Sequence, residues 1–505
     1  TLLADTHALR PAHSTPWREP LASAGNNLFR WNEVFRDWRD HVAQSPASTL
    51  GELKASGYEA LSVREEMRRN LMNKLSGDGE VFPGVIGYED TVIPQIENAL
   101  LSGQDMILLG ERGQAKSRMI RSLISLLDET IPVIDGCEIP ENPLAPISAQ
   151  GRNLVAEHGD DTPIRWMARE DRYGEKLATP DITIADLIGE VDPIKIAEGR
   201  YLSDEEALHY GMIPHTNRGI FAINELPDLA ERIQVGLLNV MEERDVQIRG
   251  HKVRMDLDVL IVATANPEDY TNRGRIITPL KDRYGAQIRT HYPQTALEEI
   301  TIMEQEQTQL DMGEYRQQVP AFMQQIVAEI TQLARQSPDI SQRSGVSVRA
   351  SVSNYEALVA NALRRAIRTG EQDVVPRISD LPFIMPSLQG KVEFEAMEDG
   401  QEDKIMNKLF EDATRTVFER FLGDQAEVLA LQFSDGLNVT TGESIPSHEY
   451  DDIVRKVDGL SEITDKMGGD NSAVRASVVE FVLEGLHLNQ LLNKDRVSGR
   501  NTYSG

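Results

Sequence analysis

Eight consecutive residues of the types that bind a phosphate chain lie between an apolar run and an amphipathic run. They are Gly110, Glu111, Arg112, Gly113, Gln114, Ala115, Lys116 and Ser117. Residues 106–109 predict a strand before them, and the spacing of apolar residues over 119–127 predicts a helix after them. A strand, a glycine-bearing loop, Lys-Ser and a helix form a P-loop, whose backbone N–H groups converge on an anion. Lys116 would reach the β and γ phosphates, and the Ser117 hydroxyl would ligate Mg²⁺.

One residue of this loop departs from the commonest pattern. Ala115 stands where a third glycine is often found. Because alanine tolerates a helical-entry conformation, we interpret the loop as a variant of the motif. The alternative is a chance match in a glycine-containing turn, which the flanking strand and helix disfavour.

A second set of polar residues follows two later apolar strands. Residues 219–223 end in Asn224 and Glu225, and residues 257–263 are followed by Asn266. Phosphoryl transfer needs one side chain to hold the Mg²⁺ shell and another to polarise the attacking water. Glu225 fits the second role, whereas Asn224 stands where a carboxylate usually holds the metal. Asn266 would face the γ-phosphate and the water, although an asparagine before proline is also ordinary turn chemistry.

These residues need a sheet to bring them together. Short strand patterns alternate with helical patterns over residues 81–293, which predicts an α/β fold, a parallel sheet with helices on both faces. The predicted strands are residues 106–109, 164–167, 219–223, 257–263 and 286–291. Residues 246–248 and 252–255 predict a β-hairpin.

The rest of the chain divides into segments of different composition. An N-terminal extension, residues 1–48, carries three of the four tryptophans and indicates no function. A helical segment, residues 49–80, contains a capping box of Ser62 and Glu65. Residues 294–390 are helical in pattern, and residues 391–505 predict a C-terminal α-helical domain whose last residues, from 497, are frayed.

The composition narrows the classes of function. Over 505 residues, 52 basic and 81 acidic side chains give a formal net charge of −29, which repels DNA and RNA. No apolar run approaches the roughly 20 residues that a membrane span needs. Cys137 is the only cysteine, so no intrachain disulfide can form. We therefore expect a cytoplasmic protein with no nucleic-acid partner and no membrane span.

The order and spacing of these motifs resemble those of the AAA+ ATPases, and within them the clade of magnesium-chelatase I subunits and MoxR proteins. The resemblance covers roughly residues 80–390. It implies a P-loop NTPase core, an α-helical lid over residues 294–390 and a ring-forming ATPase. Residues 186–218 resemble the insert in helix two of this clade, and residues 246–255 resemble its hairpin before sensor 1. These two are our candidates for transmitting the nucleotide state to a partner.

The same resemblance implies roles for further residues. Arg283 resembles the arginine finger offered to a neighbouring subunit, and Arg349 resembles the sensor-2 arginine of the lid. For either arginine the alternative is a surface ion pair, with Asp282 or another carboxylate in the case of Arg283. The segment that touches adenine would be Val85, Ile86 and Gly87.

ATP and Mg²⁺ are the cofactors that the resemblance implies, with Ser117 and Asn224 on the metal. It also implies a homo-oligomeric ring, taken as a hexamer, and a separate protein partner with or without a von Willebrand factor A-type domain. Because Asn224 stands in place of a carboxylate, the metal shell has one negative charge fewer, which would slow hydrolysis or weaken Mg²⁺ binding.

Three functions remain open. The leading hypothesis is an ATP-hydrolysing, chaperone-like AAA+ motor that remodels or activates a protein partner. The second is an authentic magnesium-chelatase ATPase subunit that drives Mg²⁺ insertion into protoporphyrin, since it shares every motif. The third is a weakly hydrolysing nucleotide-sensing scaffold, supported by Asn224 alone. A helicase is disfavoured by the charge and by the lack of an aromatic-interleaved basic stripe.

Overall fold

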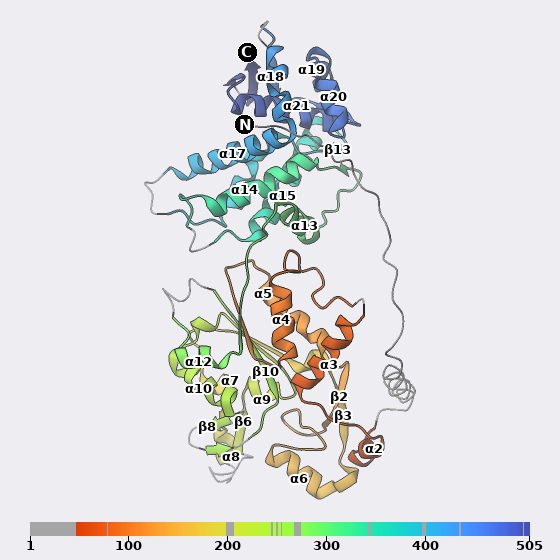
Figure 1. Ribbon diagram of the computed structural model, residues 1–505, viewed down its shortest axis with the longest axis vertical. Helices are drawn as coiled ribbons and strands as arrows, with labels where there is room; N and C mark the ends of the chain where they lie inside the picture. Colours follow the sequence, from red (N-terminus) through yellow and green to blue (C-terminus); the bar gives the residue numbers. More distant parts are fainter. Residues whose placement is uncertain are drawn as a thin grey trace, which may run out of the picture.

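The chain forms two bodies, one above the other along its longest axis (Figure 1). The lower body, up to about residue 290, is α/β, and the upper body is mainly helical. The computed structural model describes residues 47–77, 79–197, 207–243, 246–248, 251–253, 255–266, 274–341, 345–395, 400–433, 436–497 and 499–505. The predicted N-terminal extension therefore lies outside the described residues, apart from Ala47 and Ser48.

A parallel sheet forms the centre of the α/β body. Within the described residues its strand order is β11-β1-β10-β7-β4, and every neighbouring pair is parallel. The strands are β1 (Met106–Leu109), β4 (Tyr173–Leu177), β7 (Gly219–Asn224), β10 (Val259–Ala265) and β11 (Ala286–Arg289). Helices cover both faces of such a sheet, which explains why β7 and β10 are almost wholly buried.

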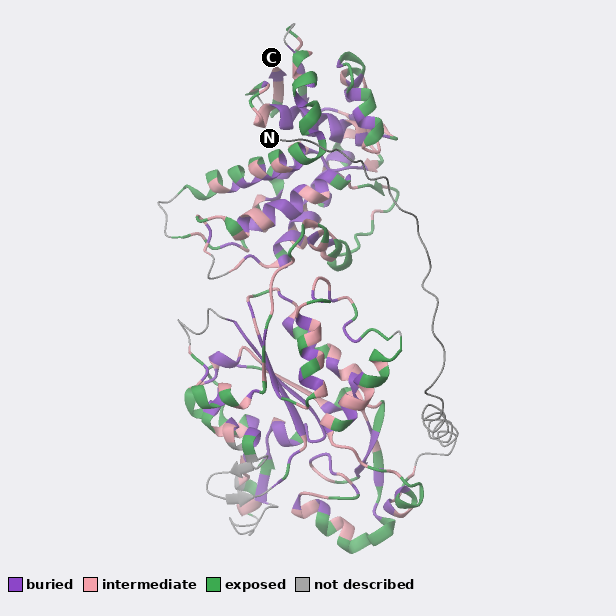
Figure 2. Ribbon diagram, viewed as in Figure 1, coloured by how far each residue is buried: buried purple, intermediate pink, exposed green. Residues whose placement is uncertain are grey.

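Alternate residues of these strands point to opposite faces, and each face has its own core. On one face Phe221 and Ile261 belong to a cluster with α10 (Glu231–Glu243) and α12 (Thr278–Arg283). On the other face Leu108 and Val262 join a cluster with three helices, α3 (Val63–Leu75), α4 (Val92–Leu101) and α5 (Lys116–Ser122). Figure 2 shows the buried sheet between these layers. The predicted α/β fold is confirmed.

One edge of the sheet differs from the prediction. The predicted strand 164–167 exists as β3 (Ile164–Ala168), but it pairs antiparallel with β2 (Thr130–Ile134) outside the main sheet. The main sheet ends in β4 instead, which is only partly buried and has no apolar run to reveal it. A buried ion pair fixes where β4 begins, because Arg172 donates to both Glu66 oxygens on α3, at 2.7 and 2.6 Å.

Short elements connect the strands. α2 (Leu50–Ala55) precedes α3, which the predicted capping box of Ser62 and Glu65 opens. β8 (Val246–Ile248) and β9 (His251–Val253) pair antiparallel, which confirms the predicted hairpin. The remaining elements of this body are α6 (Ala149–His158), α7 (Ile184–Leu187), β5 (Gly189–Val191), α8 (Pro193–Ala197), β6 (Leu208–Tyr210) and α9 (Met212–His215). Those from β5 onward lie in the predicted insert, residues 186–218, and α7 overlaps its start.

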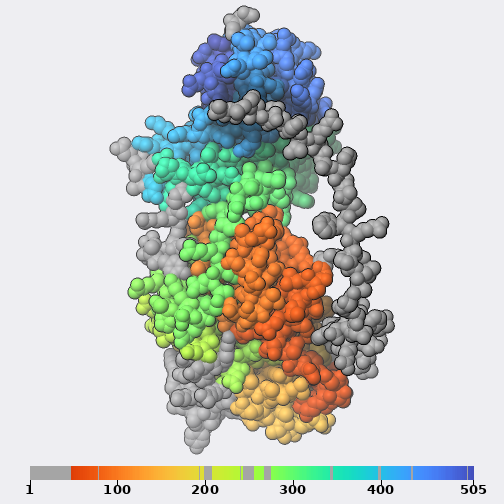
Figure 3. Space-filling model, viewed as in Figure 1, coloured from red at the N-terminus to blue at the C-terminus, as the bar shows by residue number. Residues whose placement is uncertain are grey.

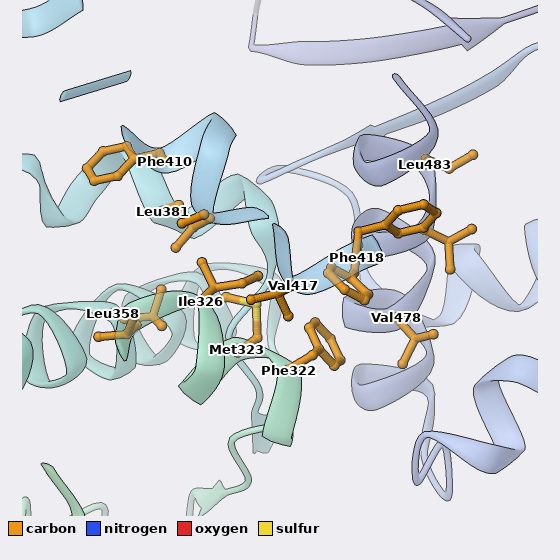
Figure 4. Close-up of a cluster of buried hydrophobic side chains, with 14 of the residues drawn as sticks. Phe322, Met323, Ile326, Leu358, Leu381, Phe410, Val417, Phe418, Val478 and Leu483 are labelled. Atoms are coloured by element: carbon orange, nitrogen blue, oxygen red, sulfur yellow. The ribbon is translucent and has the colours of Figure 1, made fainter. Parts of the chain in front are cut away.

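The helical body follows β11. Its elements are α13 (Ala296–Glu306), β12 (Arg316–Gln317), α14 (Ala321–Gln336), α15 (Val348–Thr369), β13 (Asp373–Val374), α16 (Met385–Gln389), α17 (Glu402–Leu422), α18 (Ala426–Leu431), β14 (Val439–Gly442), α19 (Tyr450–Lys456), α20 (Leu460–Lys466), α21 (Ser472–Leu488), β15 (Asn493–Val497) and β16 (Arg500–Ser504). Apolar side chains from α14, α15, α17 and α21 meet in one core, among them Phe322, Leu358, Phe418 and Val478 (Figure 4). The lid and C-terminal domain proposed from the sequence share this core, which runs from Met303 to Tyr503. None of the described helices is both long and apolar enough to cross a membrane.

The last residues form a hairpin, so the prediction that they are frayed is wrong. β15 and β16 pair antiparallel, and β14 adds a third strand. Tyr503 is 2% exposed, and its hydroxyl donates to Glu484 Oε2 on α21 at 2.6 Å. One buried aromatic side chain therefore anchors the end of the chain to the helical core.

Candidate functional site

The predicted P-loop lies at the carboxyl edge of the sheet. β1 ends at Leu109, and α5 begins at Lys116. The Gly110 N–H donates to the carbonyl of Ala265, the last residue of β10, at 3.1 Å. A Cβ on Gly110 would lie 1.8 Å from Thr290 Oγ1, just after β11, so only glycine fits there. The loop is thus fixed among strand ends, where α/β proteins bind ligands.

Lys116 is folded onto the loop that precedes it. It is 7% exposed, and its Nζ donates to the carbonyl oxygens of Gly110 at 2.5 Å and Glu111 at 2.7 Å. Ser117 is exposed in the first turn of α5. An ammonium, a hydroxyl and N–H groups beside a helix start are the groups that bind a phosphate chain and its Mg²⁺.

The prediction that Ala115 adopts a helical-entry conformation is wrong. Its φ of 53° and ψ of 13° lie in the left-handed region and not in a right-handed helical entry. For a residue with a Cβ this region is about 1–2 kcal/mol less favourable than the right-handed one. The loop therefore keeps a backbone course that glycine favours, and the surrounding contacts hold an alanine in it.

The other polar residues predicted for the site lie at the ends of β7 and β10. Glu225 has φ 55° and ψ 50°, and its N–H donates to Thr264 Oγ1 on β10 at 3.0 Å. The Thr264 hydroxyl donates in turn to Asn224 Oδ1 at 3.4 Å. Asn266, 1% exposed, directly follows β10, the strand next to β1. The structure therefore brings Asn224, Glu225 and Asn266 to the edge that carries the P-loop.

A carboxylate next to this edge, Glu175 in the middle of β4, escaped the sequence analysis because nothing marked β4 as a strand. Its Oε1 accepts from Asn224 Nδ2 at 2.5 Å. Arg121 of α5 donates to both Glu175 oxygens, from Nε at 2.8 Å and from Nη2 at 2.9 Å. Burial alone would raise the pKa of Glu175, but hydrogen bonds from Arg121 and Asn224 outweigh it and lower that pKa. The carboxylate is therefore ionised at neutral pH.

The predicted adenine segment lies between α5 and α13. The carbonyl of Gly84 accepts from Arg118 on α5 and from Gln305 on α13, both at 2.9 Å. Of the three predicted residues, Val85 is buried, and Ile86 and Gly87 are partly buried. The segment is thus held by the P-loop helix on one side and by the first helix of the helical body on the other.

The helical body meets the P-loop at the start of α15. A Cβ on Gly113 would lie 1.9 Å from Oγ of Ser347, the N-cap of that helix. Tyr292, after β11, donates from its hydroxyl to the Arg112 carbonyl at 3.1 Å. In the space-filling view the helical body lies directly above the surface formed by α4 and α5 (Figure 3). Arg349 is exposed in the first turn of α15, two residues beyond the contact with Gly113.

Arg283 is the one predicted site residue that the structure does not bring to this edge. It ends α12, which leads to the amino end of β11, whereas the P-loop follows the carboxyl end of β1. Its guanidinium donates to Glu242 on α10 and to the carbonyl of Pro279, the latter at 2.9 Å. Arg283 therefore does not belong to the P-loop site of its own chain.

Known proteins share parts of this sequence. Residues 196–281 match the sigma-54 interaction domain family. The chain is 24% identical over 240 residues to the magnesium-chelatase 38 kDa subunit of Rhodobacter capsulatus, and 25% identical over 270 residues to the magnesium-chelatase subunit ChlI of Nostoc sp.. These matches cover 45% and 50% of this chain, and 60% and 64% of the two relatives. The chain is an AAA+ protein related to the magnesium-chelatase I subunits.

Among solved structures, this AAA+ protein is similar to a chain from the complex of subunits BchI and BchD of magnesium chelatase. The identity is 16%, the TM-score is 0.30, and the match covers 68% of this chain and 97% of that chain. NtrX from Brucella abortus gives 14% identity and a TM-score of 0.38, over 71% of this chain and 69% of that chain. Likenesses this distant support no inference about function.

The residues of the AAA+ site fit Mg²⁺ that arrives with a nucleotide. Within the part of the chain that the structure describes, no three His, Cys, Asp or Glu side chains cluster to hold a metal. Mg²⁺ bound with phosphates needs few protein ligands, since phosphate oxygens and water supply the rest. The exposed Ser117 hydroxyl and the Asn224 amide oxygen meet that need.

Proposed function

We propose that this AAA+ protein binds Mg²⁺–ATP at the carboxyl edge of its sheet and hydrolyses it. The observation that carries the proposal is the convergence of Lys116, Asn224, Glu225 and Asn266 at one edge, from the P-loop and two strand ends. A purely structural ion pair would explain one charged side chain at this edge. It would not explain why a lysine folded onto its loop, an exposed hydroxyl and a carboxylate lie together on neighbouring elements.

Binding is assigned to the loop and its surroundings. Lys116 Nζ would exchange its carbonyl partners for β- and γ-phosphate oxygens, and the N–H groups of residues 110–115 would add further donors. Ser117 Oγ and Asn224 Oδ1 would hold the metal or its water, and bound Mg²⁺ neutralises phosphate charge. Arg349 would approach the γ-phosphate from α15. Adenine would contact Val85, Ile86 and Gly87.

Hydrolysis is assigned to Glu225 and Asn266. The hydrogen bond from the Glu225 N–H to Thr264 fixes the backbone of Glu225 at the end of β7. From there a carboxylate oxygen would orient the attacking water and take its proton. The Asn266 side chain, at the end of β10, would hold the same water against the γ-phosphate.

Assembly is proposed because Arg283 lies away from its own P-loop. In a homo-oligomeric ring, a hexamer, Arg283 of one protomer would reach the ATP of the next. An arginine supplied across an interface raises the rate about 10³–10⁵-fold in other phosphoryl-transfer systems. The ion pair with Glu242 would hold the Arg283 side chain until a neighbour docks.

The client is proposed to be a separate protein, with or without a von Willebrand factor A-type domain, that the ring remodels or activates in the cytoplasm. The insert between β4 and β7 and the β8–β9 hairpin would carry the nucleotide state to it. The magnesium-chelatase relatives favour a second candidate, in which the chain is the ATPase subunit for Mg²⁺ insertion into protoporphyrin.

The test is purification of the full chain with its bound partners, followed by an ATPase assay with and without them. We expect turnover that requires Mg²⁺ and that rises with the partner. Absence of turnover in assembled material would overturn the proposal. Insertion of Mg²⁺ into protoporphyrin by the same complex would select the second candidate.

A further inference from the structure

A series of hydrogen bonds crosses three strands at the carboxyl edge, and every donor in it is directed toward Glu175. The Glu225 N–H donates to Thr264 Oγ1 at 3.0 Å, the Thr264 hydroxyl to Asn224 Oδ1 at 3.4 Å, and Asn224 Nδ2 to Glu175 Oε1 at 2.5 Å. Hydrogen bonds in series polarise one another, and those that end on a charged acceptor are the strongest. The Glu175 oxygen at the end of the series accepts a hydrogen bond, so every donor before it points toward Glu175.

The Asn224 side chain has two unlike ends. Only its oxygen can approach a cation, because its NH₂ group is a donor, and only that NH₂ group can bond a carboxylate. Contact with Glu175 therefore determines the orientation of the amide. Nδ2 faces Glu175, and Oδ1 remains for Thr264 and for the shell of a metal.

We propose that Glu175 is a positioning residue for the magnesium site, which fixes the Asn224 amide so that its oxygen replaces the missing carboxylate. Asn224 and Glu175 then carry together the single negative charge that an aspartate would bring to the end of β7. Arg121 holds the Glu175 carboxylate from α5, one helical turn beyond Ser117. This inference rests on the proposed function and adds one residue to it.

The pairing also explains why an aspartate at position 224 would not suit this chain. Glu175 lies 2.5 Å from the Asn224 side chain. An aspartate would have no N–H to donate to Glu175, and two negative charges at that separation repel each other. In this chain Asn224→Asp should therefore weaken the magnesium site, unless the Glu175 charge is removed as well.

The test is the Mg²⁺ concentration at half-maximal binding of a fluorescent ATP analogue to the full chain, at fixed nucleotide. Glu175→Gln should raise this midpoint at least about tenfold, the usual effect of losing a group that orients a metal ligand. Asn224→Asp should raise it as well. The double variant Asn224→Asp/Glu175→Gln should return to within about threefold of the parent, since it restores one charge beside one oxygen ligand.

Two single variants separate positioning from a structural role. Arg121→Gln breaks the ion pair but leaves the Glu175 carboxylate bonded to Asn224, so its midpoint should shift less than that of Glu175→Gln. Glu170→Gln removes an equal charge from an exposed pair with Arg169 and should leave the midpoint within about threefold. Thermal unfolding without nucleotide checks that each variant is folded.

Three outcomes are distinguishable. Recovery in the double variant, which a folding defect would not produce, supports the inference. Equal shifts for Glu175→Gln and Arg121→Gln, or no shift for Glu175→Gln in a parent that binds nucleotide with Mg²⁺, would overturn it alone. A folded parent that binds no nucleotide at any Mg²⁺ concentration would overturn the proposed function as well.

Discussion

Two polar networks in this molecule use the same residue types in different surroundings. At the sheet edge, Asn224 and Glu225 are partly exposed, and the Arg121 side chain that pairs with Glu175 is 62% exposed. In the helical body, Arg365 pairs with Asp380 at 3.1 Å, and these side chains are 1% and 0% exposed. One network is partly open to solvent, and the other is sealed.

In the sealed network, the polar groups bond to one another and to nearby backbone groups. Asp380 also accepts from Asn361 Nδ2 at 2.7 Å and from the Arg377 N–H at 2.8 Å, and Arg365 donates to the Val375 carbonyl at 2.5 Å. These bonds join α15 to the segment that follows it, and breaking one partner would leave a buried charge. The sealed pair of Arg365 and Asp380 therefore stabilises the fold. We expect changes in the open network to alter ligand binding and catalysis instead.

The largest effect on the open side is expected at Arg283. Arg283→Ala should lower hydrolysis by the assembled ring about 10³-fold or more, because it removes the cation offered to the neighbouring site. ATP affinity should hardly change, since Arg283 lies away from its own P-loop. Steady-state ATPase and nucleotide titration measure the two quantities. Arg455→Ala, at an exposed pair with Asp452, is the control, and equal activity in both variants would refute the role of Arg283.

Glu225→Gln is expected to have the next largest effect on hydrolysis. Loss of the group that takes the proton of the attacking water should lower turnover about 10²–10⁴-fold while ATP stays bound. Single-turnover assays with radiolabelled ATP, and the nucleotide content of the purified variant, measure both effects. Glu231→Gln, an exposed carboxylate at the start of α10, should behave as the parent. Undiminished turnover by Glu225→Gln would show that the open network has no part in catalysis.

The sealed network should respond in stability alone. Arg365→Ala leaves Asp380 buried without its cation and should lower the free energy of unfolding of the helical body by about 3–5 kcal/mol. Arg415→Ala on α17 is the control, because this side chain is 47% exposed and its pair with Asp412 contributes about 0–1 kcal/mol. Urea denaturation measures both. If Arg365→Ala weakened ATP binding and left unfolding unchanged, the contrast between the networks would fail.

The smallest effect is expected where the helical body touches the loop. Tyr292→Phe removes the hydrogen bond to the Arg112 carbonyl but keeps the ring beneath the Arg335 guanidinium, 4.3 Å from the ring centroid. We expect a loss of about 0.5–1.5 kcal/mol in ATP binding free energy, a factor of a few. Calorimetric titration would measure it, and a complete loss of binding would show that the contact does more than align the loop.

Runs of apolar residues and the positions of glycines in the sequence predicted the buried strands and the P-loop. β1, β7 and β10 are buried on both faces and are therefore apolar, and the P-loop needs Gly110 because Thr290 fills the space of a Cβ. Asn224, Glu225 and Asn266 could be placed because they follow those strands. The capping box of Ser62 and Glu65 was predictable because both residues lie within one helical turn of the sequence.

Features set by distant contacts could not be predicted. Glu175 meets Asn224, 49 residues further along the chain, through a half-exposed edge strand that has no hydropathy signal. The left-handed conformation of Ala115 depends on the loop around it, not on alanine. The terminal hairpin depends on Tyr503 reaching Glu484 on a helix. The role of Arg283 concerns a second chain and stays a prediction.

The central claim is that the open edge holds Mg²⁺–ATP with Lys116 on its phosphates. Titration calorimetry of Mg²⁺–ATP into the full chain and into Lys116→Ala tests it most directly. We predict saturable binding by the parent and none by the variant at millimolar nucleotide, with both chains equally folded by thermal unfolding. Equal binding by both chains, or no binding by a folded parent, would contradict the claim.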